Sequence, residues 1–273
     1  KALQMPEVKR IYLEKPVCSS EAEERQMAQL LAGSDKKVQV GFQYLQTPAV
    51  RETLRFWRSG ILGRALHFDL KYYHGDYLQP AYRARRRTRL TPAPDGGAMA
   101  DLGSHGISLL TAFLGNGLQM LHAVQAGQFD DVPAGSDLFS AVSLYDPQSG
   151  AAGHLSASRI SSGSGDLVEL EIYAEKGVLC FSNRQPDQFS YFLEEDGRWV
   201  NQPVGSNYAG ITTFPSGHVP AGWLRSMVHA HYLFLGGEDP DTFIPDLAHG
   251  LEVQRLVRET AHHLAQFRNS VKL

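Results

Sequence analysis

The sequence predicts the remnant of a parallel α/β domain followed by an α+β domain with one open, mainly antiparallel sheet and flanking helices. Two observations predict this order. A strand, helix and strand pattern fills the first 42 residues, and short runs with a period of two recur between residues 66 and 202. We therefore expect residues 1–46 to belong to the first domain and residues 47–273 to the second.

The chain opens with one βαβ unit. Residues 8–13 are a short run rich in β-branched and aromatic side chains, as in a strand. Ser20 and Glu23 have the spacing of a capping box, which predicts a helix that ends at Gly33. Residues 38–42 form a continuous apolar run, typical of a strand buried in a parallel sheet. Two parallel strands are unstable alone, so we expect further strands to complete this sheet.

The second domain is expected to begin with a helix that has Thr47 as its N-cap and Pro48 as its first residue. Its apolar stripe contains Val50, Leu54, Trp57 and Ile61. Eight segments then alternate like half-buried strands, and we interpret them as an antiparallel meander: 66–72, 121–129, 138–145, 154–159, 167–174, 178–181, 189–193 and 199–202. Two helices are expected near 223–235 and 246–267.

Composition excludes several classes of partner. The formal net charge is -3 and the pI is about 6.4, so the chain lacks the basic excess that binds nucleic acid phosphates. No apolar run approaches the length of a membrane span. Cys18 and Cys180 fit neither a disulfide framework nor a metal site, so we expect free thiols, a cytoplasmic location and no bound metal.

The tripeptide Glu14-Lys15-Pro16 follows the first predicted strand. Ligands of open α/β sheets bind at the carboxyl ends of strands, so Lys15 is placed to reach a bound substrate. A partly buried lysine has a lowered pKa and can protonate or polarise an oxygen. The alternative is a solvated lysine at a strand end.

A second segment with chemical potential runs from Gly96 to His105. If a helix starts near Gly97, then Asp101, His105 and Ser108 share one face at i, i+4 and i+7. The other rows are apolar, so the polar row is expected to face a cleft. The alternative is an intrahelical Asp and His pair on the solvated side of the helix.

The segment 217–223 is a loop that opens a helix and presents His218 and Trp223. An aromatic face and a histidine suit a ring that carries hydroxyl groups. A histidine in a loop is also commonly structural, which leaves both interpretations open.

A basic loop precedes the two glycines and contains five arginines: Arg83, Arg85, Arg86, Arg87 and Arg89. One interpretation is a solvated loop. The other is a lid in which Arg85 and Arg87 bind an anionic substrate, such as a phosphorylated or carboxylated sugar.

Five ordered segments together resemble the glucose-fructose oxidoreductase, inositol dehydrogenase and rhizopine catabolism family, written Gfo/Idh/MocA. They are EKP at 14–16, VGFQY at 40–44, GGAMADLGSH at 96–105, GHVPAGW at 217–223 and DLAHGLEV at 246–253. From the first to the last, they span residues 14–253, which is nearly the whole chain. Five segments in one order are more specific than any one of them.

The resemblance implies a Rossmann domain that binds NAD or NADP, followed by an open-sheet domain that holds a sugar or polyol and mediates homo-oligomer contacts. It implies Lys15, Asp101 and His105 as the catalytic group. Glu14, Lys15, Pro16 and Gln43 would lie near the nicotinamide. Ser108, His218 and Trp223 would approach the substrate, although many members of the family have Asp at the position of Ser108.

No G-x-G-x-x-G precedes the first strand, and the part that would carry it corresponds to about three βαβ units of roughly 30 residues each. Without it the pyrophosphate lacks a helix N-terminus, so we expect the chain to be incomplete. Two rival functions stay open. A non-catalytic NAD(P)-sensing regulator would bind cofactor without turnover, and an NAD-dependent glycoside-cleaving enzyme would show no net reduction of NAD.

Overall fold

The computed structural model describes residues 2–93, 96–127, 129–204, 223–239 and 241–270. An eight-stranded sheet dominates it, in the order β10-β9-β8-β7-β3-β6-β5-β4. Its strands are β3 (Ala65–Tyr73), β4 (Gln119–Ala126), β5 (Phe139–Tyr145), β6 (Ala152–Ser158), β7 (Leu167–Ala174), β8 (Gly177–Ser182), β9 (Gln188–Leu193) and β10 (Arg198–Pro203). The predicted fold class is confirmed.

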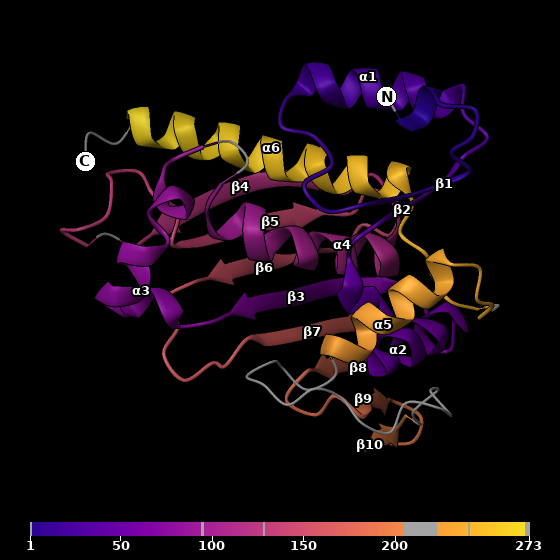
Figure 1. Cartoon of the computed structure of the whole chain (residues 1–273). Helices are drawn as coiled ribbons and strands as arrows, with labels where there is room; N and C mark the ends of the chain where they lie inside the picture. Colours follow the sequence, from indigo (N-terminus) through magenta and orange to yellow (C-terminus); the bar gives the residue numbers. More distant parts are fainter. Residues whose placement is uncertain (1, 94–95, 128, 205–222, 240, 271–273) are drawn as a thin grey trace.

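The central strand departs from the predicted meander. β3 pairs antiparallel with β7 but parallel with β6, so it separates the two antiparallel ribbons β4-β5-β6 and β7-β8-β9-β10. A parallel neighbour requires a crossover connection. The chain makes this crossover through the long segment between β3 and β4, which contains Asp101 and the helix that carries His105 (Figure 1). It then returns through β4 and β5 to β6.

The alternation predicted for β3 holds from Phe68 to Tyr72, but it fails at the start of the strand. Leu66 is 46% exposed because the β3–β7 register shifts at this point, and Leu121 of β4 is 57% exposed beside a similar shift. A bulge adds one residue and so reverses the faces of the residues before it. The predicted alternation therefore does not hold at these two positions.

Helices cover the sheet and connect it to the N-terminal unit (Figure 1). They are α2 (Pro48–Arg58), α3 (Pro80–Arg85), α4 (Ser104–Leu114), α5 (Trp223–Phe234) and α6 (Leu247–Ser270). Gly106 lets α4 lie close to the sheet, since a Cβ there would meet the Leu70 side chain at 2.6 Å. No helix among the described residues is long and apolar enough for a bilayer crossing.

The start of α2 agrees with the prediction in position but not in contact. Thr47 is the N-cap residue, yet its hydroxyl pairs with the Ser226 hydroxyl at 2.9 Å and makes no cap hydrogen bond. Ile61 lies beyond the end of α2 and is 47% exposed, so it is not part of the buried stripe.

The N-terminal unit consists of β1 (Arg10–Leu13), α1 (Glu21–Ala32) and β2 (Lys37–Val40), and the two strands pair in parallel. The Ser20 hydroxyl accepts from the Glu23 N–H at 3.3 Å, while the Glu23 carboxylate accepts from the Ser19 N–H at 2.8 Å. The predicted helix cap is therefore present, with its returning bond shifted to Ser19. α1 packs along α6, as Figure 1 shows.

Candidate active site

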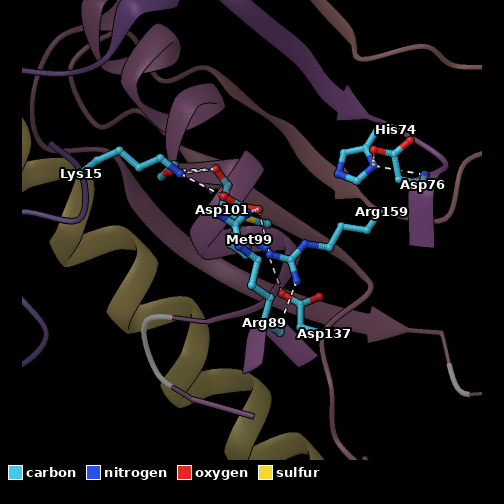
Figure 2. A network of polar contacts seen from close by, with 9 residues as sticks. Lys15, His74, Asp76, Arg89, Met99, Asp101, Asp137 and Arg159 are labelled. Atoms are coloured by element: carbon cyan, nitrogen blue, oxygen red, sulfur yellow. Dashed lines mark hydrogen bonds and ion pairs between the residues drawn. The ribbon is translucent and has the colours of Figure 1, made fainter. Parts of the chain in front are cut away.

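Lys15 follows β1 and reaches the segment before α4. Its Nζ donates to the Asp101 backbone carbonyl at 2.7 Å and pairs with Asp101 Oδ1 at 3.2 Å. The Lys15 side chain is 18% exposed, so the alternative of a solvated lysine at a strand end does not describe it. Figure 2 shows this side chain extending toward Asp101 from the N-terminal unit.

Asp101 lies in a π-helical turn, Met99–Gly103, that leads into α4. Its Oδ2 accepts from Arg159 at 2.9 Å and from Arg89 at 3.2 Å, so three cations surround one carboxylate (Figure 2). Burial raises the pKa of Asp101, but the charges of Lys15, Arg159 and Arg89 outweigh it and hold that pKa well below its usual range. Asp101 is therefore ionised at neutral pH.

His105 lies one turn further on, at 7% exposure, with its ring edge-to-face with Phe42 and Tyr44. Burial, reinforced by the charge of Lys15, lowers the pKa of His105 to about 3. Its Nδ1 is buried and has no hydrogen-bond partner among the described residues. His105 is therefore a neutral imidazole, and its Nδ1 is a buried polar atom left unsatisfied by the described residues.

Two residues predicted near the cofactor and the substrate lie together. With its amide oriented to satisfy both neighbours, Gln43 donates to the Gly41 carbonyl at 2.7 Å and accepts from Trp223 Nε1 at 3.2 Å. Glu14 lies over Gly41, where a Cβ would be 2.9 Å from Glu14 Oε2. The structure thus brings Glu14, Gln43 and Trp223 to the same end of the N-terminal strands as Lys15.

Pro16 follows Lys15 through a cis peptide bond and lines a narrow cavity. Ala100, Ser104 and Gly250 line the same cavity from the π-helical turn, α4 and α6. Pro16 is therefore beside the predicted catalytic residues.

Ser108 does not face a cleft, contrary to the expectation from helical spacing. It is 1% exposed, and its hydroxyl lies 2.8 Å from His249 Nε2. Phe42 contacts the ring of His105 on α4 and the ring of His249 on α6. α6 therefore covers the part of the polar row that contains Ser108. Helical spacing within α4 does not predict that α6 packs there.

The arginine-rich segment predicted as a loop instead forms α3 and a 3₁₀ helix at Arg87–Leu90, and it contributes a different arginine from those predicted. Arg85 and Arg87 are exposed, and no hydrogen bond or ion pair among the described residues joins them to Lys15, Asp101 or His105. Arg89 makes that contact instead, although its side chain is 54% exposed. His218 lies outside the described residues.

Sequence reasoning missed two features of the site. Arg159 ends the β6 segment and is 2% exposed, with its guanidinium paired to Asp101. Tyr44 and Tyr72 share a hydrogen bond of 2.8 Å beside His105. Arg159 is the last residue of the predicted strand 154–159, but its partner Asp101 lies in a distant segment that no local pattern links to it. The tyrosine pair depends on tertiary packing that no local pattern shows.

Residues 50–180 match the family model described as the GFO/IDH/MocA C-terminal domain. This segment is therefore similar to the C-terminal domain of GFO/IDH/MocA proteins. A curated relative is the levoglucosan dehydrogenase of Pseudarthrobacter phenanthrenivorans, which is 22% identical over 272 residues. That alignment covers 90% of this chain and 69% of the relative.

Solved structures of other proteins bound to cofactor show the same fold. A levoglucosan dehydrogenase in complex with NADH and L-sorbose superposes with a TM-score of 0.77 at 22% identity, covering 97% of this chain and 74% of that one. An inositol dehydrogenase homologue complexed with NAD+ from Azotobacter vinelandii gives a TM-score of 0.71 at 17% identity, with 94% and 70% covered. At these identities the likeness establishes the fold.

Proposed function

We propose that this protein is an NAD(P)-dependent dehydrogenase that transfers a hydride between a sugar or polyol hydroxyl carbon and a nicotinamide cofactor. The observation that carries the proposal is the meeting of Lys15 with Asp101, one helical turn from His105. A charged donor and a neutral ring nitrogen are the two groups that hydroxyl oxidation needs. The similarity to dehydrogenases bound to NADH or NAD+ adds support.

Oxidation of a carbinol removes a hydride from carbon and a proton from oxygen. When bound, the nicotinamide supplies the hydride acceptor. Lys15 donates a hydrogen bond to the reacting oxygen and stabilises the negative charge that develops there, while His105 accepts the hydroxyl proton. Asp101 holds the Lys15 ammonium in place through two contacts.

A histidine with an ordinary pKa near neutrality is a suitable general base. Burial instead lowers the pKa of His105 to about 3. At neutral pH the ring is a free acceptor but a weak base. Proton transfer therefore depends on Lys15 stabilising the alkoxide as it forms.

The residues present suit the nicotinamide half of a dinucleotide. The buried Nδ1 of His105 lacks a partner among the described residues, and Lys15 has a third N–H beyond its two bonds to Asp101. Glu14, Pro16 and Gln43 adjoin them and would hold the nicotinamide end. These residues would serve NAD or NADP equally, because the 2′ position of the adenine ribose is recognised elsewhere in such folds.

We also propose a cytoplasmic homo-oligomer that associates through the open sheet. Cys18 and Cys180 are both free, which suits a reducing compartment. The outward positions of β5 are partly exposed between buried ones, so this face of the sheet presents surface to a second copy.

Turnover by single variants tests the proposed function. Reduction of NAD and NADP is measured over a panel of sugars and polyols for the protein and for Lys15→Ala and His105→Ala. Each variant should lose about 100-fold or more in kcat while NADH binding, measured by fluorescence titration, survives. Arg25→Ala is the matched control, because Arg25 pairs with Glu21 on the exposed surface of α1.

Near-normal turnover in either site variant would refute the assignment of roles. Cofactor binding with no turnover on any substrate would favour a regulator. Glycoside cleavage without net reduction of NAD would favour the hydrolytic alternative.

A further inference from the structure

We propose that Asp137 is a positioning residue, which fixes Asp101 against Lys15 and Arg159 by holding the start of the helical segment that carries Asp101. Its importance for turnover rests on the proposed function. Its structural part does not, since it concerns contacts within this chain. Figure 2 shows Asp137 below Asp101, next to Met99.

Asp137 holds the helix start at two successive amides. Its Oδ2 accepts from the Met99 N–H at 2.9 Å, and its backbone carbonyl accepts from the Ala98 N–H at 3.0 Å. The other carboxylate oxygen accepts from the Ser140 hydroxyl at 2.5 Å, which fixes the rotamer of Asp137. The first N–H groups of a helix have no partner within it, and a side-chain acceptor that binds them stabilises its start.

Gly97 makes this close contact possible. Its φ is +87°, and a Cβ at this position would lie 2.5 Å from Asp137 Cβ. Only glycine adopts this conformation readily while leaving space for the aspartate. The Gly-Gly pair before the helix, noted in the sequence, is thus matched to an acidic residue about 40 positions later.

The same short segment also fixes Arg159. The carbonyl of Leu138, the next residue, accepts from the Arg159 N–H at 2.8 Å. Residues 137 and 138 therefore bind both the backbone that carries Asp101 and the backbone that carries its buried cation. A loss of the Asp137 contacts would move Asp101 relative to Arg159 and to Lys15 together.

The test measures how strongly Asp101 shields Lys15, with no need for turnover. The protein is acylated with a limiting amount of acetic anhydride, and modification of Lys15 is quantified by mass spectrometry. Asp101→Asn removes the ion pair with Lys15, so it gives the level of modification expected when Asp101 no longer shields this lysine. Asp137→Ala should raise Lys15 modification about fivefold, the change that loss of one helix cap produces, and Asp137→Asn should restore the low rate because its amide oxygen still accepts from Met99.

Asp146→Ala is the matched control. Asp146 stands at the other end of β5 and also binds backbone amides, those of Gln148 and Ser149. It should destabilise the fold without changing the modification of Lys15. If Asp137→Ala does not fold, Gly97→Ala disturbs the same contact from the helix side and should also raise the modification.

The proposal is overturned if Lys15 modification in Asp137→Ala or Gly97→Ala equals that of the parent, or if Asp146→Ala raises it as much. In kinetics, Asp137→Ala should lower kcat with little change in KM, and Asp137→Asn should restore it. If the protein has no dehydrogenase activity, the proposed function is wrong. The modification experiment still tests the role of Asp137 in that case.

Discussion

Lys15 and Asp101 meet in one site, but the regions that carry them differ in construction. Every residue of α4 from Ser104 to Phe113 is buried, whereas α1 of the N-terminal unit has no buried residue. The N-terminal sheet has two described strands, against eight in the main sheet. Dense core packing therefore holds α4, which follows Asp101, whereas α1, which follows Lys15, is held by a few specific long-range contacts.

Paired glycine substitutions give the largest effect expected from this difference. A Cβ at Gly153 would lie 2.0 Å from the Phe68 carbonyl, inside the parallel pair of β3 and β6, whereas a Cβ at Gly33 after α1 would meet nothing within 4 Å. Gly153→Ala should lower the free energy of unfolding by about 3 kcal/mol, the upper part of the range for overpacking. Gly33→Ala should change it by less than about 0.5 kcal/mol.

Urea denaturation of both variants measures these values. Equal effects in the two variants would show that the N-terminal unit is packed as tightly as the sheet, and the comparison would fail.

Two buried histidines sharpen the comparison through pH. Burial lowers the pKa of His105 to about 3 and that of His249 to about 4, and both rings contact Phe42. The unfolded chain, with pKa near 6.5, binds more protons than the folded protein below that pH. The free energy of unfolding is therefore fully retained above pH 6.5. As the pH falls from 6.5 toward 4, it decreases by about 1.4 kcal/mol per pH unit for each histidine.

Denaturation at pH 7, 6 and 5 tests this expectation. His249→Gln keeps a hydrogen-bonding group toward Ser108 but removes one titratable group. The slope of the free energy of unfolding against pH should therefore fall by about 1.4 kcal/mol per pH unit. A slope unchanged by the substitution would mean that His249 is not buried as a neutral ring. In turnover, His105 should give no acid limb near pH 6.5.

Much of the fold was predictable because it follows from local periodicity. The alternation of β5 and the Thr47-Pro48 start of α2 identify these elements from the local sequence alone. The parallel pairing of β3 with β6 was not predictable, since strand order depends on long-range packing. The bulge that exposes Leu66 was also missed, because one inserted residue leaves no clear mark in an apolar sequence.

The site divides in the same way. Lys15, Asp101 and His105 were predicted from a strand end, a helical spacing and a family resemblance, and the structure brings them together. Arg159, Arg89 and Asp137 act through contacts that join distant segments, so spacing within one segment could not reveal them. Ser108 shows the converse, because a correct helical row does not predict which part of it another helix covers.

The smallest expected effect concerns the ion pair that fastens α1 to α6. Arg258 binds Glu24 through Nε at 2.8 Å and Nη2 at 2.9 Å, and the side chains are 18% and 11% exposed. Arg258→Ala should cost about 1 kcal/mol, near the upper value for an exposed pair because this one is bidentate and largely shielded. Since α1 has no buried residue, the loss should be local and should speed amide hydrogen exchange in α1 about fivefold.

Exchange in α4 should stay unchanged in Arg258→Ala, because α4 is held by the core. Arg25→Ala is the control, since Arg25 pairs with Glu21 within α1 and both side chains are more than half exposed. It should leave exchange in both helices unchanged. Equal acceleration of α1 and α4 in Arg258→Ala would mean that the ion pair supports the whole fold, and the two regions that supply Lys15 and Asp101 would then unfold as one unit.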